Sequence, residues 1–506
     1  MTKYNTSQMD VPLVSVIIPV YNMQEFLAQT IESVLSTAYS SFEVIIVDDG
    51  STDKSLSIAN EYSDKDKRIR VLSQQNSGVS SARNHAVREA SGKYILPVDA
   101  DNLLSSDYIQ SAVDVLESNE KVRVVTCKSV FFGDRTGEWK LRPFSLKLLA
   151  RKNMMDTCAM YRKSDWQSIN GYCEYIKGRE DWDFWISLLK RGGEVTCLPI
   201  IGFKYRIRNN SKRVTDRNFK RNIISILNKR HKAFFYRELG GKLHYRRTWS
   251  GLFNFFIHLI KPETIKVNPA YPNLDEFVYN IPELFETSGK TIHSIRNTIK
   301  TFEENKYKIV VKSFHKPNFI NKFIYGNFRD SKAHRSYDYA LKLIGLGIGT
   351  PAPVGYYEQK CAFLFLKSYY ACLQSECPYQ FSDLIKEIEF PDRNQILKAV
   401  GRFTANLHEK GVRHHDYSAG NILFKKTGSE IEIELIDLNR IEFGNVDIQK
   451  GCKNFERLNI DDESLKIMAN EYALARGFDS EVCVSNILTM RWKKHKNISN
   501  SQIDSL

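Results

Sequence analysis

The stretch that decides the fold of the first half reads Val14-Ser15-Val16-Ile17-Ile18-Pro19-Val20-Tyr21-Asn22. Its continuous run of apolar, mostly β-branched side chains is typical of a strand buried on both faces of a sheet. Beyond it, helical spacing and short apolar runs alternate, at residues 24–37, 44–47, 53–62, 69–72, 80–90 and 94–98. Because parallel strands need such crossover helices, this order predicts a Rossmann-like α/β domain with a mostly parallel sheet.

The bulk composition limits the class of protein. A chain of 506 residues is too long for one hydrophobic core, and its 42% hydrophobic and 26% charged residues exclude a disordered chain. The net charge of +14 favours polyanionic partners such as nucleotides, phospholipid head groups or nucleic acid. No base-reading motif is recognised, so we do not expect a nucleic-acid partner.

The cysteines and the apolar runs bear on the compartment. The nine cysteines are scattered without a C-x-x-C pair, which indicates reduced thiols rather than a disulfide frame or a zinc site. Residues 1–10 lack the pattern of a signal segment, and no apolar run reaches the roughly 18 residues that a membrane span needs. We therefore expect a cytoplasmic protein.

Four segments are expected along the chain: 1–210, a basic and aromatic extension with a linker at 211–280, a further domain at 281–460, and C-terminal helices with a tail at 461–506. Basic residues at 212–247 far outnumber the opposing acids Asp216 and Glu238, and aromatic residues lie among and after them. This extension could rest on an anionic membrane surface. The alternative is a solvated helix face whose aromatic side chains join two domains.

Two acidic clusters directly follow expected strands, Asp48-Asp49 and Asp99-Ala100-Asp101. Ligands of open α/β sheets bind beyond the carboxyl ends of the strands. Carboxylates there can hold Mg²⁺ or Mn²⁺, which then bridges to a diphosphate. The alternative is that these acids only stop strands and begin turns.

Further polar residues are expected near the same edge. Ser77-Gly78 and Arg83-Asn84 offer a flexible loop and a cation. Glu180-Asp181 opens an amphipathic helix, where an acid would suit a general base acting on a hydroxyl. The alternative for these acids is a first helical turn favoured by the helix dipole.

Together these motifs resemble the family 2 glycosyltransferases with a GT-A fold, over roughly the first 210 residues. The resemblance implies an inverting enzyme that transfers sugar from a nucleoside diphosphate sugar, expected to be a UDP-sugar, with Mn²⁺ or Mg²⁺. It implies that Asp49, with Asp48, binds the nucleoside, and that Asp101, with Asp99, binds the metal on the donor diphosphate. It implies that Arg83, together with Arg206 or Arg208, neutralises the charge of the donor. It also implies that Asp181, or its rival Glu180, is the general base.

The second half has its own pattern. Residues 291–302 and 307–314 predict a hairpin, and residues 331–346 and 396–410 predict helices. Asp416 and Asn421 have the D-x-x-x-x-N spacing in which the acid orients a hydroxyl and the amide holds a metal. Asp437 ends a later apolar strand. Each of these acids alone is more often a turn residue.

This second pattern resembles the small lipopolysaccharide kinases of the 3-deoxy-octulosonic acid and heptose type, which are relatives of the protein kinases. The resemblance implies a two-lobed α+β kinase-like domain that uses ATP. It implies that Lys312 holds phosphate, that Asp338 pairs with Lys312, that Asp416 is the catalytic acid, and that Asn421 and Asp437 hold the metal. The chain departs from the pattern in lacking a G-x-G-x-x-G loop and in having Asp437-Leu438-Asn439 where Asp-Phe-Gly is usual.

The combined hypothesis is a bifunctional enzyme that builds and phosphorylates a saccharide or glycolipid acceptor. It would be peripheral on the inner face of the cytoplasmic membrane. The alternative is a glycosyltransferase whose kinase-like half is an inactive scaffold, which the altered motifs favour.

Overall fold

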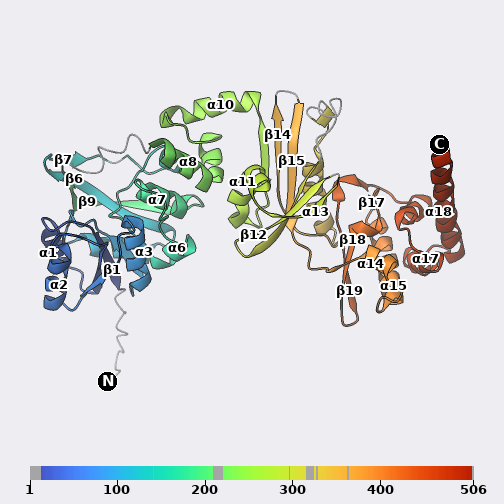
Figure 1. Ribbon diagram of the computed structural model, residues 1–506, viewed down its shortest axis with the longest axis horizontal. Coiled ribbons are helices and arrows are strands. Elements are labelled where there is room, and N and C mark those ends of the chain that lie inside the picture. The colour runs from blue at the N-terminus through green and yellow to red at the C-terminus, as the bar shows by residue number, and fades with distance from the viewer. Residues whose placement is uncertain are drawn as a thin grey trace, which may run out of the picture. The chain divides into compact units, whose positions relative to one another are not determined.

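The computed structural model describes residues 13–140, 142–208, 220–295, 297–314, 324–325, 329–361 and 364–503, with side chains up to residue 491. The basic residues Lys212, Arg213 and Arg217 of the predicted extension, and Asp216, lie outside these ranges. The chain divides into two compact units, Met1–Phe255 and Phe256–Leu506 (Figure 1). No helix in the described residues is both long and apolar enough to cross a membrane.

The first unit is built on one large sheet with the strand order β3-β2-β1-β4-β8-β6-β9-β5. Its first part is parallel and comprises β1 (Val14–Val20), β2 (Phe42–Asp48), β3 (Ile69–Ser73) and β4 (Tyr94–Pro97). Its second part is mixed and comprises β5 (Leu103–Leu104), β6 (Val122–Gly133), β7 (Gly137–Trp139), β8 (Met160–Arg162) and β9 (Glu194–Ile207). The predicted α/β class holds: the first part of the sheet is parallel, and in the mixed second part β6 and β9 are also parallel, whereas the pairs β4–β8, β6–β8, β6–β7 and β5–β9 are antiparallel.

Helices accompany these strands along the chain, and the last of them continues past Phe255, where the unit ends. They are α1 (Leu27–Leu35), α2 (Ser55–Lys65), α3 (Val79–Glu89), α4 (Tyr108–Ser118), α5 (Leu146–Leu149), α6 (Lys163–Ser168), α7 (Glu180–Leu189), α8 (Lys220–Arg230), α9 (Lys232–Leu239) and α10 (Ser250–Ile260). Alternation along β1 separates two cores: Val16 and Ile18 pack in one cluster with residues of α1 and α4, and Ile17 packs in the other with residues of α3 and α7. Both faces of β1 are buried, as its sequence predicts.

The second unit begins with a six-stranded sheet in the order β10-β14-β15-β13-β12-β11. Its elements are β10 (Glu263–Val267), α11 (Asp275–Thr287), β11 (Lys290–Ser294), β12 (Thr298–Glu304), β13 (Tyr307–Ser313), α13 (Lys332–Gly345), β14 (Pro353–Cys361) and β15 (Leu364–Leu373). The predicted hairpin is formed by β12 and β13, with Asn305 and Lys306 at positive φ in its turn.

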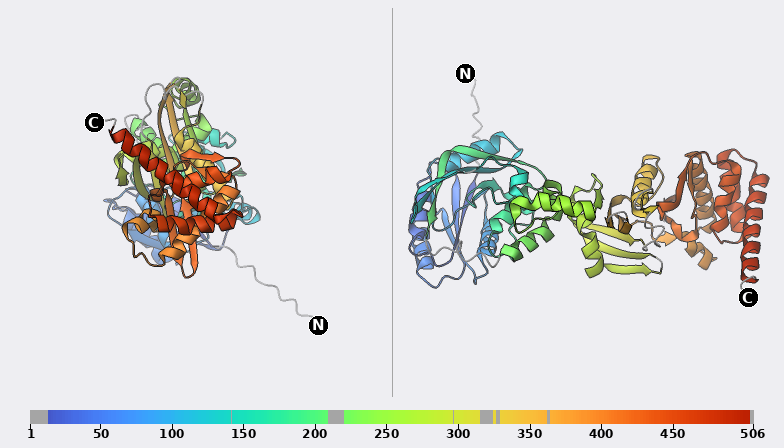
Figure 2. Two further views of the ribbon diagram at one scale, coloured as in Figure 1. Left: turned by 90° about the vertical axis from the view of Figure 1, so that its right-hand side faces the viewer. Right: turned by 90° about the horizontal axis from the view of Figure 1, so that it is seen from above.

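The rest of the second unit is mainly helical. It contains β16 (Tyr379–Gln380), α14 (Phe381–Lys386), α15 (Arg393–Glu409), β17 (Val412–His414), β18 (Ile422–Thr427), β19 (Glu430–Leu435), β20 (Ile441–Phe443), α16 (Ile448–Asn454), α17 (Asp462–Arg476) and α18 (Ser480–Ile503). The red helices α17 and α18 lie side by side (Figure 2).

The boundaries of this unit differ from those predicted. It begins before residue 281, because β10 pairs with β14 and α11 buries Val278 and Ile281 in the core of the sheet. Helix α17, predicted among separate C-terminal helices, belongs to this unit, because its Leu465, Met468 and Tyr472 share a buried core with α15. The predicted extension and linker at 211–280 therefore ends earlier than expected, since β10 and α11 are part of the second unit.

Candidate active sites

Asp49 organises the loop that follows β3. Its Oδ1 accepts hydrogen bonds from the Gln74 side chain and the Ser77 amide, both at 2.8 Å, and its Oδ2 accepts from the Gly78 amide at 2.9 Å. Asp48 beside it is also buried, but its Oδ1 has no hydrogen-bond partner among the described residues. Asp49 is therefore engaged by protein donors, whereas the Asp48 Oδ1 is buried and has no partner among the described residues.

Arg83 joins two of the predicted acids. Its guanidinium is buried and lies 2.8 Å from Asp99 and 3.4 Å from Glu180. Burial alone would lower the pKa of Arg83, but the charges of Asp99 and Glu180 overcome it and raise the pKa above its usual value. The structure thus uses this cation to hold the end of β4 against the start of α7.

Asp101 lies near two arginines of the end of β9. Arg208 pairs with its carboxylate at 2.8 Å, and the Nε of Arg206 donates to its backbone carbonyl at 2.9 Å. The guanidinium of Arg206 also lies over the rings of Phe26 and Phe132. Burial, and then the neighbouring charge of Asp99, raises the pKa of Asp101. The two carboxylates are therefore close enough to repel each other.

Asp181, predicted as the general base, lies at the start of α7. Its Oδ2 accepts a 2.6 Å hydrogen bond from Asn153, and burial followed by the charge of Glu180 raises its pKa to about 7. A carboxylate with a pKa near neutrality can take a proton from a sugar hydroxyl and still be ionised at pH 7. Asp183, two residues later, instead turns inward to Arg230 and His231.

A cavity of about 860 Å³ brings together the predicted residues Arg83, Asp99, Glu180 and Asp181, whereas Asp48, Asp49, Asp101, Arg206 and Arg208 are not among the residues that line it. Ser77 and Gly78 line it at the end beside Asp49, and Asp99, Glu180 and Asp181 line it further along. Two acidic clusters that are about eighty residues apart in the sequence therefore share one concave surface with the loop after β3. A pocket of this size fits a ligand as large as a sugar nucleotide.

Asp156 also lines this cavity, although no pattern in the sequence indicated it. Its side chain is buried, its Oδ1 accepts from the Cys158 amide at 3.0 Å, and burial followed by the charge of Asp99 raises its pKa to about 7. Asp156 belongs to no motif, because only the fold brings it near Asp99 and Asp181. No signal in the linear sequence could have found it.

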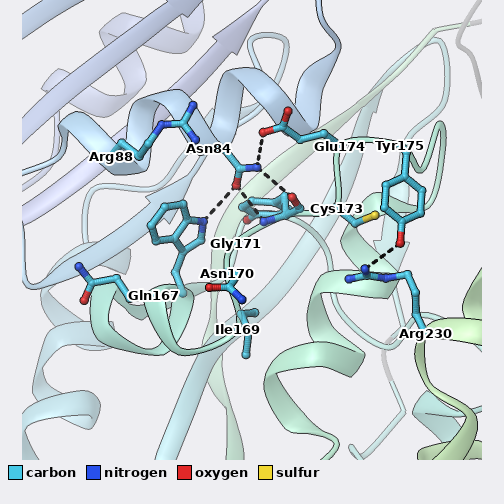
Figure 3. A pocket seen from close by; sticks show the side chains of 12 residues that line it. Asn84, Arg88, Gln167, Ile169, Asn170, Gly171, Cys173, Glu174, Tyr175 and Arg230 are labelled. Atoms are coloured by element: carbon cyan, nitrogen blue, oxygen red, sulfur yellow. Dashed lines mark hydrogen bonds between the residues drawn. The ribbon is translucent and has the colours of Figure 1, made fainter. Parts of the chain in front are cut away.

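Asn84 of α3 fixes the loop that contains Tyr172 and Glu174. Its amide nitrogen donates to the Tyr172 carbonyl and to Glu174, both at 2.8 Å, and its oxygen accepts from the Trp166 indole at 3.2 Å (Figure 3). These residues line a second cavity of about 620 Å³. Because Glu174 also lines the larger cavity, Asn84 helps to shape its wall.

In the second unit, Lys312 of β13 lies 2.7 Å from Asp437. The sequence predicted Asp338 as the partner of Lys312, and this pairing is corrected: Asp338 pairs with His334 at 3.0 Å, one turn earlier on α13. Residues four apart on a helix lie on the same face, and the short, half-exposed Asp338 side chain stays there. Asp437 has a positive φ of 59°, an uncommon conformation that is concentrated at functional sites.

His414 links the two predicted catalytic segments. Its Nδ1 accepts from the Asp416 amide at 3.1 Å, so its Nε2 carries the proton that is shared with the Ile436 carbonyl at 3.2 Å. Burial lowers the pKa of His414, which keeps the ring neutral as these bonds require. The Asn421 amide group in turn donates to the Asp416 carbonyl at 2.9 Å, which leaves the Asn421 oxygen available. His414 thereby fixes Asp416 beside Asp437.

Two arginines near Asp416 went unpredicted. Arg457 lies 2.8 Å from its Oδ1, and Arg440 lies 3.8 Å from its Oδ2. Arg440 follows Asp437 in the sequence, but nothing in the linear pattern relates Arg457 to Asp416. Asp416 is therefore held between two cations that a substrate phosphate or carboxylate could also contact.

Divalent cations fit both sites on the chemistry of the donor atoms. Oxygen ligands suit Mg²⁺ and Mn²⁺, and the mutual repulsion of Asp99 and Asp101 would be relieved by a cation. Asn421 and Asp437 offer oxygens of the same kind. Among the described residues, no group of three or more His, Cys, Asp or Glu side chains is arranged to hold a metal ion.

Comparison with known proteins gives related sequences for the first half. Residues 15–179 match the model of glycosyl transferase family 2. The putative teichuronic acid biosynthesis glycosyltransferase TuaG of Bacillus subtilis is 34% identical over 208 residues, which are 40% of this chain and 81% of TuaG. The uncharacterized glycosyltransferase EpsJ of Bacillus subtilis is 43% identical over 117 residues, 23% of this chain and 34% of EpsJ. Chondroitin synthase of Escherichia coli is 31% identical over 189 residues, 36% of this chain and 27% of the synthase. The chain thus spans about a third of the length of EpsJ and about a quarter of the length of chondroitin synthase.

Solved structures are similar to each half. Staphylococcus aureus TarS 1-349 in complex with UDP-GlcNAc has 17% identity and a TM-score of 0.38, and the match covers 58% of this chain and 98% of TarS 1-349. WaaP in complex with acyl carrier protein has 15% identity and a TM-score of 0.35, and the match covers 46% of this chain and 98% of WaaP.

The second half has a family model of its own. Residues 292–473 match the lipopolysaccharide kinase (Kdo/WaaP) family, in the unit that contains Lys312, Asp416 and Asp437. The two family matches and the two sheets confirm the predicted fold classes, GT-A and kinase-like. The chain belongs to glycosyl transferase family 2 through its first half, and its second half is a domain of the lipopolysaccharide kinase (Kdo/WaaP) family.

Proposed function

We propose that the first unit transfers a sugar, with inversion, from a nucleoside diphosphate sugar to a saccharide hydroxyl. The observation that supports this most is Asp181, a carboxyl with a pKa of about 7 in the cavity that also holds Asp99 and Glu180. Inversion needs one base on the side of the sugar away from the diphosphate. Asp181 has the pKa that this task requires.

In this mechanism Asp181 accepts the proton of the acceptor hydroxyl as its oxygen bonds to the anomeric carbon. The bond from that carbon to the diphosphate oxygen breaks, and the nucleoside diphosphate leaves. Asn153 orients the Asp181 carboxylate through its 2.6 Å hydrogen bond. A Mn²⁺ or Mg²⁺ ion held by Asp99 and Asp101 would supply positive charge to the leaving diphosphate.

The nucleoside end is assigned to the edge beside Asp48. Asp49 holds Ser77 and Gly78, which line the cavity at this end, and the Asp48 carboxylate beside it is buried with its Oδ1 unpartnered among the described residues. We propose a UDP-sugar as the donor. TuaG is named for teichuronic acid biosynthesis, and its similarity favours a saccharide acceptor.

The test is transfer from a panel of sugar nucleotides with Mn²⁺, using the full chain. We expect Asp181→Asn to reduce kcat by about 100- to 10,000-fold, the range for loss of a general base. Asp114→Asn, on the exposed face of α4, is the matched control and should retain activity. Equal activity of Asp181→Asn and wild type would remove Asp181 from this role.

We propose that the second unit transfers the γ-phosphoryl group of ATP to a saccharide or glycolipid hydroxyl. Asp416, fixed by His414, would orient that hydroxyl, and Lys312 beside Asp437 would contact the phosphates. Asn421 and Asp437 would hold a divalent cation that neutralises phosphate charge. The positive φ of Asp437 directs its carboxylate, which supports an active site over a structural turn.

One observation favours the alternative of an inactive scaffold. The Asp416 carboxylate is engaged by Arg457 at 2.8 Å and would have to be shared with an acceptor. Incubation of the full chain with labelled ATP, Mg²⁺ and 3-deoxy-octulosonic acid glycolipids distinguishes an active kinase from an inactive scaffold. Phosphorylated product that is lost in Asp416→Asn supports the kinase, whereas ATP binding without product from any sugar acceptor supports the scaffold.

An anionic membrane surface is proposed as a partner, through α10. This helix has the reverse of the usual polarity: its two buried residues, Ser250 and Asn254, are polar and hydrogen-bonded to the protein. Its exposed residues, apart from His258, are apolar and include Leu252, Phe253, Ile257, Leu259 and Ile260. Arg246 and Lys261 flank the helix, so that apolar and cationic groups occur together as in helices that lie in a membrane interface.

Flotation with vesicles of phosphatidylglycerol and phosphatidylcholine tests this surface. We expect binding that requires the anionic lipid and is lost in Phe253→Glu with Leu259→Glu. Leu474→Glu is the matched control, because Leu474 is an exposed leucine on α17. Binding that persists in the α10 variant, or no binding to anionic vesicles, would rule out this partner.

A further inference from the structure

Four cationic side chains line one part of the large cavity of the first unit: Lys152, Lys177, Arg179 and Arg247. Among the described residues none of them forms an ion pair with an acid, in contrast to Arg83 and Arg208. Arg247 is half-buried, and burial followed by the charge of Arg179 lowers its pKa. Arg179 and Arg247 therefore lie close enough for their positive charges to interact, in a cavity that Asp99, Asp156, Glu174, Glu180 and Asp181 also line.

The backbone and the packing hold these cations in place. Arg179 has a positive φ of 59°, which is uncommon for a residue with a side chain. The guanidinium of Arg247 lies 5.4 Å from the centre of the Trp182 ring. Neighbouring positive charges repel each other, which costs free energy. An anionic ligand bound between Arg179 and Arg247 would offset this repulsion.

The cations surround the general base rather than the nucleoside end. Lys152 precedes Asn153, which donates to Asp181. Arg179 lies two residues before Asp181, and Arg247 stacks on Trp182, the residue after it. Ser77 and Gly78, by contrast, line the cavity at the Asp49 end. The side of the base is the side from which the acceptor hydroxyl must approach.

We propose that Lys152, Arg179 and Arg247 form an acceptor subsite for an anionic group, so that the acceptor of this transferase carries a phosphate or a carboxylate near the hydroxyl that receives the sugar. This inference rests on the proposed glycosyltransferase function. Arginine pairs bind both groups through paired N–H donors, so the subsite chemistry is shared by phosphorylated saccharides and uronic acids.

The experiment compares three acceptors that share one sugar: a neutral form, a phosphorylated form and a uronic acid form. Initial rates are measured with the full chain, Mn²⁺ and a fixed donor. We expect at least one anionic acceptor to have a KM about 10-fold or more below that of the neutral acceptor. The anionic acceptor with the lower KM shows whether the subsite prefers a phosphate or a carboxylate. Inorganic phosphate should compete with the acceptor and not with the donor.

Variants separate this subsite from donor binding. Arg247→Gln should raise the KM of the preferred anionic acceptor about 10-fold and leave the KM of the sugar nucleotide within about twofold. Arg247→Lys, which keeps the charge, should recover part of the loss. Lys242→Gln, an exposed position in the same segment that does not line the cavity, is the matched control.

The outcomes distinguish the two proposals. A wild-type enzyme that uses neutral and anionic acceptors equally, or an Arg247→Gln variant that loses donor affinity instead, overturns the anionic subsite while transferase activity stands. A wild-type protein that turns over no sugar nucleotide overturns the proposed function and the subsite with it.

Discussion

The guanidinium of Arg83 on α3 lies 2.8 Å from the carboxylate of Asp99 after β4, and 3.4 Å from that of Glu180 at the start of α7. One buried cation thus connects the predicted metal-binding segment to the segment of the predicted base. The arrangement fixes the width of the cavity between them. It also means that Arg83 neutralises protein charge before any donor is present.

Replacing Arg83 by methionine should destabilise the first unit. The change leaves Asp99 and Glu180 without their shared cation, and breaking a buried ion pair on one side costs about 3–5 kcal/mol. Urea unfolding of the full chain, followed by a probe in the first unit such as Trp182, measures the loss. Arg88→Met on the exposed side of the same helix is the control and should stay within about 0.5 kcal/mol of wild type. Similar losses for both variants would contradict the bridging role.

The pH dependence of transfer should identify the base. Asp181 accepts a proton only when ionised, so kcat/KM should fall about tenfold per pH unit below its pKa of about 7 and level off above it. The charge of Glu180 helps to raise this pKa, and Glu180→Gln should therefore move the acidic limb to lower pH. If Glu180 were the base, the same variant would lose activity at every pH, which would reverse the assignment.

Asp156 should make the stability of the first unit depend on pH. Its pKa is about 7 in the folded chain and 3.8 in the reference state, so the folded state holds a proton that the unfolded state releases between these values. The contribution of Asp156 to the free energy of unfolding is therefore fully present below about pH 4 and is lost as the pH rises through about 7.

The Asp156→Asn variant has no carboxyl to ionise, so it should not lose stability as the pH rises. Its side-chain oxygen can still accept the hydrogen bond from the Cys158 amide. We expect the variant to unfold at a higher Tm than wild type at pH 7.5, by about 2–4 °C for each kcal/mol gained, and at the same Tm near pH 4. Thermal scans at the two pH values provide the measurement. A variant that is less stable than wild type at pH 7.5 would show that the ionised carboxylate is favourable there.

The Lys312–Asp437 pair should be required for phosphoryl transfer. Lys312→Met and Asp437→Asn should each lower kcat by about 100-fold or more, because each removes a group aimed at phosphate or its cation. Asparagine is chosen at position 437 because it tolerates the positive φ observed there. Lys308→Met, an exposed lysine on the same strand, should retain activity. Transfer that survives both variants would place the ATP site elsewhere.

Much of the fold could be predicted because its signals are local. The apolar run of β1, the crossover helices and the β12–β13 turn follow from burial and backbone geometry within a few residues. The acids at the strand ends are local in the same sense, since parallel strands present their carboxyl ends at one edge. Asp48, Asp99, Asp416 and Asn421 could thus be singled out before any coordinates.

The sequence by itself determined the two family memberships, the class of each domain and the positions of the acids that follow its strands. The tertiary structure alone decided which charges meet: Arg83 with Glu180 across 97 residues, Arg457 with Asp416 across 41, and Asp156 with the cavity of Asp181. It also decided that β10 and α11 belong to the second unit, and that Lys312 pairs with Asp437 rather than with Asp338. The physical reason is that side-chain periodicity encodes burial one residue at a time, whereas the pairing of distant charges depends on the path of the whole chain between them.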